Sequence, residues 1–148
     1  VLCNLGIVIE RLARVDEAKA AFQAASRIAK ELGDPRYEGQ FLGYLGLLHA
    51  RQGEHVHASR ILESGEALLR AASDKAGLGV LLTSRAEAHH LAGDEAMASS
   101  LLAQAATIAT EIGAGPASEI GLAQARVHAL LEAGRGVSAS ARSELQRT

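Results

Sequence analysis

The segment AKAAFQAASRIAKEL, from Ala18 to Leu32, places small or apolar residues along one face of a helix. Its face consists of Ala18, Ala21, Phe22, Ala25, Ile28, Ala29 and Leu32. All of these positions stay small or apolar when 40 is added to each number, and again when 80 is added. The chain is therefore an array of repeats about 40 residues long, and this segment is one helix of the unit.

A second helix precedes this segment in each unit, because Leu2, Leu42 and Leu82 align, as do Gly6, Gly46 and Ala86. Turns at Gly53-Glu54 and Gly93-Asp94 separate the two helices, and Gly33-Asp34-Pro35 ends the first unit. We expect an all-α array of about 7–8 helices in antiparallel pairs. The expected units are about 1–34, 35–74, 75–114 and 115–148, all in one domain. The last is partial or capping, with a helix at about 117–133 and a short capping helix or frayed end at 137–148.

Composition narrows the classes of function. Hydrophobic residues make up 48% of the chain and charged residues 22%, which is typical of a folded, soluble domain. A formal net charge of −2 makes nucleic acid and anionic membranes poor partners. The single cysteine, Cys3, favours a reducing compartment, so we expect a cytoplasmic protein. Because the chain opens inside a helical pattern, we also expect it to be a fragment of a longer protein.

The unit resembles the tetratricopeptide repeat, in a longer form of about 40 residues found in bacteria. The residues that carry the resemblance are Leu5-Gly6, Ile9, Ala18, Phe22 and Ala25 in the first unit and Leu45-Gly46, Ala58 and Leu62 in the second. The third unit has Arg85-Ala86 in place of Leu-Gly but keeps Ala98, Leu102 and Ala105. The resemblance implies a right-handed α-solenoid that binds proteins and is not an enzyme. Residues 86–131 also look like the repeat region of large bacterial signalling proteins.

In solenoids of this family, the first helix of each pair lines a concave groove that holds a partner's peptide or helix. Arg11 and Arg51 occupy equivalent places and predict a carboxylate anchor, unless they are solvated or pair with Glu10 and Glu54. The other end is predicted to be acidic and titratable. The predicted groove residues are Asn4, Ile7, Arg11, Tyr44, Leu47, Arg51, Glu87, His90, Gln124 and His128.

The histidines are the one unusual polar feature, in the pairs His55 with His57 and His89 with His90. A metal site is disfavoured, because adjacent residues of a helix point about 100° apart. His49 and His89 share a repeat column with Ile9, which indicates partly buried packing residues. No glycine-rich phosphate-binding motif occurs, so we predict no cofactor.

Two other functions stay open. The repeats could drive homo-oligomerisation through an uncapped N-terminal end, without a separate ligand. Alternatively, histidine and glutamate side chains between Glu87 and His128 could form a metal or small-molecule site.

Overall fold

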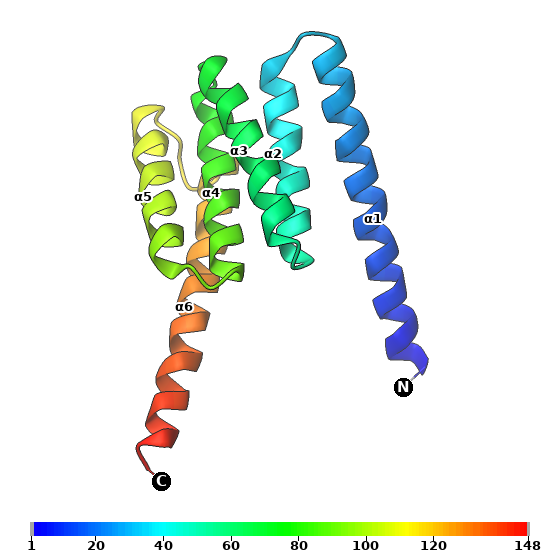
Figure 1. Ribbon diagram of the computed structural model, residues 1–148. Helices are drawn as coiled ribbons and strands as arrows, with labels where there is room; N and C mark the ends of the chain where they lie inside the picture. The colour runs from blue at the N-terminus through cyan, green and yellow to red at the C-terminus, as the bar shows by residue number, and fades with distance from the viewer. Residues whose placement is uncertain (1, 148) are drawn as a thin grey trace.

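The computed structural model describes residues 2–147, with side chains from residue 11 onward. Within this range the protein has six helices and no strand (Figure 1). The helices are α1 (Leu2–Glu31), α2 (Pro35–Arg51), α3 (His55–Ala71), α4 (Lys75–Leu91), α5 (Glu95–Glu111) and α6 (Glu119–Leu145). The predicted all-α class is confirmed. No described helix combines the length and the apolar character needed to cross a membrane.

The helices end at a regular series of turns. Five residues spaced 20 positions apart in the sequence have a positive φ: Gly33 (69°), Gly53 (81°), Ser73 (55°), Gly93 (86°) and Gly113 (67°). A residue in this left-handed conformation ends a helix, and glycine adopts it without a Cβ penalty. Because the turns recur at a constant spacing, α2 to α5 are each 17 residues long and run alternately up and down.

The prediction of 7–8 helices is wrong, because α1 and α6 each run through a place where a turn was expected. The turn series, extended by 20 in either direction, reaches Ala13 and Ala133. Alanine is a strong helix former and is disfavoured in the left-handed region. Gly134 comes one residue late and remains helical, so the expected short C-terminal segment is the last part of α6. Both long helices extend beyond the bundle (Figure 1).

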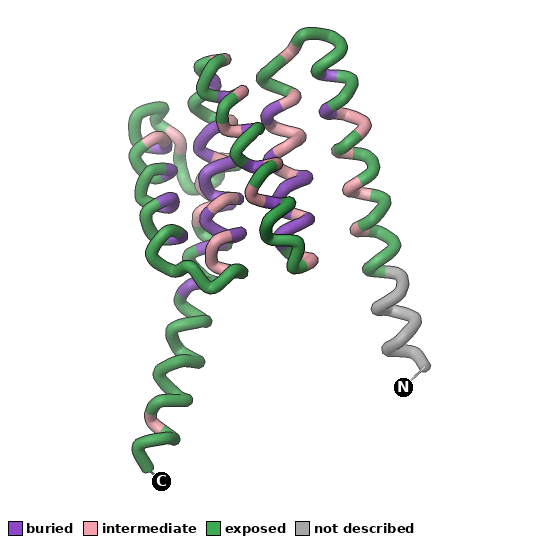
Figure 2. The backbone as a smooth tube through the Cα atoms, viewed as in Figure 1, coloured by how far each residue is buried: buried purple, intermediate pink, exposed green. Residues whose placement is uncertain are grey.

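The core lies between α4 and its neighbours. α4 packs against α2, α3, α5 and α6, whereas α1 packs on α2 alone within the described residues. Buried positions therefore concentrate in α2 to α5 and in the first half of α6 (Figure 2). The largest fully buried side chains are Leu62, Leu69, Leu81, Leu82, Thr83 and Val127.

Glycines of α2 allow α3 to approach closely. A Cβ added to Gly46 would lie 2.6 Å from the Leu62 Cγ, and one on Gly39 would lie 2.7 Å from the Leu69 Cγ. Both leucines belong to the repeated face of α3 and are almost completely buried. The two helices thus interlock along this face, as the repeat pattern predicts.

Candidate functional site

The helices α2, α4 and α6 line a shared groove with a volume of about 370 Å³. One return helix separates each from the next, so all three run in the same direction. Phe22 of α1 closes one side of the groove. Its other lining residues are Tyr44, Leu47, Leu48 and Arg51 of α2, Val80 and Ser84 of α4, and Glu119, Leu122, Ala123 and Arg126 of α6.

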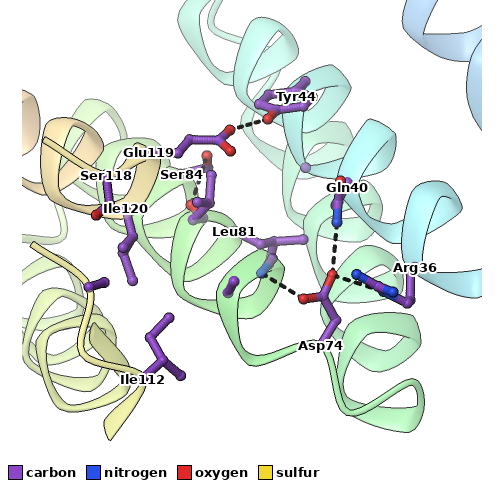
Figure 3. A pocket seen from close by; sticks show the side chains of 15 residues that line it. Arg36, Gln40, Tyr44, Asp74, Leu81, Ser84, Ile112, Ser118, Glu119 and Ile120 are labelled. Carbon is purple, nitrogen blue, oxygen red and sulfur yellow. Dashed lines mark hydrogen bonds and ion pairs between the residues drawn. The ribbon is translucent and has the colours of Figure 1, made fainter. Parts of the chain in front are cut away.

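A smaller pocket of about 210 Å³ adjoins the groove at the start of these helices (Figure 3). Its apolar walls come from Val80, Leu81, Ile112 and Ile120. Four residues line both hollows, namely Tyr44, Val80, Ser84 and Glu119. The two hollows are therefore adjacent, and together they extend across three repeats.

Tyr44 and Glu119 meet at the boundary between the groove and the pocket. The Tyr44 hydroxyl donates a hydrogen bond to the Glu119 Oε1, which connects α2 to the first turn of α6 (Figure 3). Burial raises the pKa of Tyr44 to about 12, and the hydrogen bond to Glu119 and its negative charge add to the shift. The Tyr44 ring also packs on Phe22, with the ring centroids 5.3 Å apart. Tyr44 therefore presents a neutral hydroxyl at neutral pH.

Two arginines converge on a single buried carboxylate below the groove. The Arg51 Nε donates to the Glu87 Oε1 at 2.8 Å, and its Nη2 donates to Oε2 at 3.2 Å. The Arg126 Nη2 lies 3.5 Å from the same Oε2. The Glu87 side chain is 4% exposed, whereas those of Arg51 and Arg126 are 41% and 51% exposed. The cluster carries one net positive charge, and both arginine side chains are partly exposed to solvent.

A second carboxylate closes the outer end of the pocket. Asp74 is buried and caps the start of α4, where its Oδ1 accepts a hydrogen bond from the Gly77 backbone at 3.0 Å. Its Oδ2 accepts one from the Gln40 Nε2 at 2.8 Å, and the Arg36 Nε lies 3.8 Å away (Figure 3). These partners satisfy Asp74, so the part of the pocket that is free for a ligand is mainly apolar.

The structure brings together only part of the predicted groove. Tyr44, Leu47 and Arg51 line it, and Glu87 lies buried beneath it. Arg11 is exposed on α1 and lines no part of the groove. Arg51 pairs with Glu87 and not with Glu54, so its guanidinium is not a free anchor. The side chains of Asn4 and Ile7 lie outside the described residues.

The predicted acidic region from Glu87 to His128 is not one surface. Glu87 is neutralised by its arginines, the His90 Nδ1 contacts Glu95, and His128 is exposed away from the groove. The Gln124 side chain points inward, since its Nε2 is buried without a hydrogen-bond partner. Of these four predicted residues, none lines the groove itself.

The start of α6 differs from the position that the repeat spacing predicts. By repeat spacing α6 should begin near residue 115, four residues before its observed start at Glu119. The connection through Gly115 and Pro116 takes up those residues, and α6 lines the groove with Glu119, Leu122, Ala123 and Arg126. The repeat spacing did not indicate Glu119, Leu122 or Arg126. The longer glycine- and proline-containing connection was the only signal in the sequence that could have indicated them.

Histidines at the ends of the first helices are partly buried, as predicted for His49 and His89. The His49 Nδ1 lies 2.9 Å from the Glu54 Oε2, and the His89 Nδ1 lies 3.5 Å from the Asp94 Oδ2. Hydrogen bonds from His49 and Lys19 lower the pKa of Glu54. Each histidine thus binds the carboxylate that follows the next glycine turn. Among the side chains that the structure describes, from residue 11 to 147, no group of three or more histidine, cysteine, aspartate or glutamate residues could hold a metal ion.

Comparison with known proteins gives no match: no family model fits the chain, and neither the curated proteins nor the solved structures include a significant relative. The geometry of the groove and the pocket is therefore the basis for a functional proposal.

Proposed function

We propose that this protein is a tetratricopeptide-like interaction module whose groove binds a helix or peptide segment of a partner protein. The observation that carries the proposal is the depression formed by the two adjacent hollows along α2, α4 and α6. In a right-handed solenoid this depression would be the concave face. The repeat resemblance favours such an arrangement, and also a place within a larger bacterial signalling protein.

The chemistry of the depression suits a segment with an apolar anchor. The pocket has aliphatic walls, and Leu122 on the adjoining groove is 62% exposed. A partner side chain of the size of leucine or phenylalanine would cover these surfaces, and burying it would contribute about 1.5–3 kcal/mol. The residue that enters the pocket would then be the main determinant of affinity.

The arginine cluster supplies direction along the groove. Arg51 and Arg126 share the single carboxylate of Glu87 and are partly exposed, so the net positive charge of this cluster favours an acidic side chain of the partner. The apolar pocket lies at the start of α2 and α4, and the arginines lie toward the end of α2. A bound segment would therefore place its apolar residue and its acidic residue at opposite ends.

Selection from a random peptide display library tests this function without a known partner. The wild-type chain should enrich peptides that combine an apolar and an acidic residue at a fixed spacing. Leu122→Asp should weaken the selected peptides at least tenfold, and Arg126→Glu should weaken those with the acidic residue. Val137→Asp and Arg60→Glu are matched controls, because both positions are exposed and lie outside the groove. Peptides that bind all four variants equally well would refute the proposal.

A further inference from the structure

The repeated helix face is covered in the second and third units but only half covered in α1. Ala58 and Ala98 are 1% and 0% exposed, and Leu62 and Leu102 are 1% and 3% exposed. The equivalent residues of α1, Ala18 and Phe22, are only partly buried, as is Ala25. In α3 the cover comes from α2, the preceding helix of the same unit. In the first unit no such helix lies against α1, because residues 2–13 continue straight into it.

The sequence of residues 2–13 nevertheless has the pattern of that covering helix. Leu5, Gly6 and Ile9 stand where α2 has Leu45, Gly46 and His49, all of which are buried. What the first unit lacks is the turn. Ala13 and Arg14 replace Gly53-Glu54 and Gly93-Asp94, and alanine in the left-handed conformation would cost roughly 1–2 kcal/mol. Folding back within the same chain is therefore disfavoured.

We propose that residues 2–13 of a second copy of this chain cover the exposed face of α1, in a reciprocal helix exchange. This inference stands apart from the proposed groove function, because it depends on the repeat pattern and the missing turn. The two α1 helices would lie antiparallel, so that each copy gives a covering helix and receives one. Such a symmetric exchange forms the same contacts that residues 2–13 would make by folding back onto their own α1, and it does not require a left-handed turn at Ala13.

The register of the exchange follows from the second unit. Gly46 lies against Leu62, so one repeat earlier Gly6 of one copy would lie against Phe22 of the other. The same register places Arg11 opposite Glu17 and centres the crossing on Arg14. Asp16 and Glu17 flank this centre, so each copy contributes as many acidic as basic side chains there. The charges are thus compatible with close approach of the two copies.

The single cysteine provides a direct test of this register. A Cβ built on Gly43 would lie 3.7 Å from the Leu81 Cβ, which is within the roughly 3.5–4.5 Å range of a disulfide. The residues that lie 40 positions before Gly43 and Leu81 are Cys3 and Phe41. In the exchanged dimer, a cysteine at position 41 would therefore lie beside Cys3 of the other copy.

The experiment has two parts. The Phe41→Cys variant is oxidised and run on non-reducing electrophoresis, and the mass of the unoxidised chain is measured by light scattering. We expect a disulfide-linked dimer that reductant dissolves, and a solution mass about twice 15.4 kDa. Ser64→Cys, on the exposed side of α3, is the matched control and should stay unlinked. If oxidised Phe41→Cys were a monomer with the disulfide inside one chain, residues 2–13 would fold back onto their own α1 and the exchange would be wrong. If light scattering showed a monomer at every protein concentration, the exchange would be wrong as well.

Restoring the missing turn gives a second readout that does not depend on cysteine chemistry. Ala13→Gly combined with Arg14→Asp recreates the Gly93-Asp94 sequence, so residues 2–13 should fold back and the chain should become monomeric. Arg14→Asp alone changes the charge without the glycine and should remain dimeric. The exchange is wrong if both variants keep the same mass as the wild type.

Discussion

Arg51 of α2 holds Glu87 of α4 through two parallel hydrogen bonds, of 2.8 Å and 3.2 Å, and so joins the first helices of two successive units. The Glu87 side chain is 4% exposed, so loss of Arg51 would leave a buried carboxylate with Arg126 as its remaining ionic partner. Arg51→Ala should therefore lower the free energy of unfolding by about 1–3 kcal/mol, as measured by urea denaturation. The matched control is Lys75→Ala, which breaks an exposed ion pair with Glu111 and should cost less than about 1 kcal/mol. Equal losses in the two variants would contradict the structural role given to Glu87.

Tyr44 should titrate far above an ordinary tyrosine. The chain has two tyrosines, so Tyr37→Phe leaves Tyr44 as the only phenol, and its absorbance should report a pKa of about 12. Glu119→Gln should lower this pKa but not return it to 10.0, because burial is the largest cause of the shift. A midpoint that Glu119→Gln leaves unchanged would show that the hydrogen bond between the two residues does not form in solution.

The raised pKa of Tyr44 also predicts how stability depends on pH. Between pH 10.0 and about 12 the folded state keeps a proton that the unfolded state has released. The contribution of Tyr44 is therefore complete below pH 10.0 and is lost as the pH rises through about 12. Urea denaturation of the wild type and of Tyr44→Phe should show stabilities that converge over this interval. A constant difference between the two proteins would be inconsistent with the shift.

Gly46 tests whether close helix approach is required. A Cβ at this position would lie 2.6 Å from the Leu62 Cγ and 2.8 Å from its Cδ2, and Leu62 is 1% exposed. Gly46→Ala should therefore destabilise the protein by about 1–3 kcal/mol, although alanine is the better helix former. Gly136→Ala is the matched control, since a Cβ there would have open space around it and should add up to about 1 kcal/mol. Stabilisation by both substitutions would mean that α2 and α3 are not tightly interlocked.

Sequence periodicity was enough to predict the all-helical class, the turns of the middle units and the repeated face that packs in the core. It was not enough for the two ends, because the pattern of residues 2–13 and 134–148 says which residues would pack but not whether the chain turns. Ala13 and Ala133 decide that question through a local backbone preference. The predicted residues that line the groove, Tyr44, Leu47 and Arg51, all belong to α2, whereas α6 begins four residues later than the repeat spacing places it and lines the groove with residues that were not predicted. Such a shift depends on the path of one connection and has no counterpart in a periodic pattern.

Ser73 is the one non-glycine residue in the turn series, with a φ of 55°, and it offers the most direct test of that series. Ser73→Gly removes the Cβ from a left-handed residue and should raise the free energy of unfolding by about 1 kcal/mol. Gly93→Ala makes the opposite change at an equivalent turn and should lower it by roughly 1–2 kcal/mol. Ala72→Gly is the matched control, because residue 72 caps α3 in the right-handed conformation and should gain nothing from glycine. If Ser73→Gly and Ala72→Gly had the same effect in urea denaturation, the left-handed turn would not be what ends α3, and the explanation given for the continuous helices α1 and α6 would fail with it.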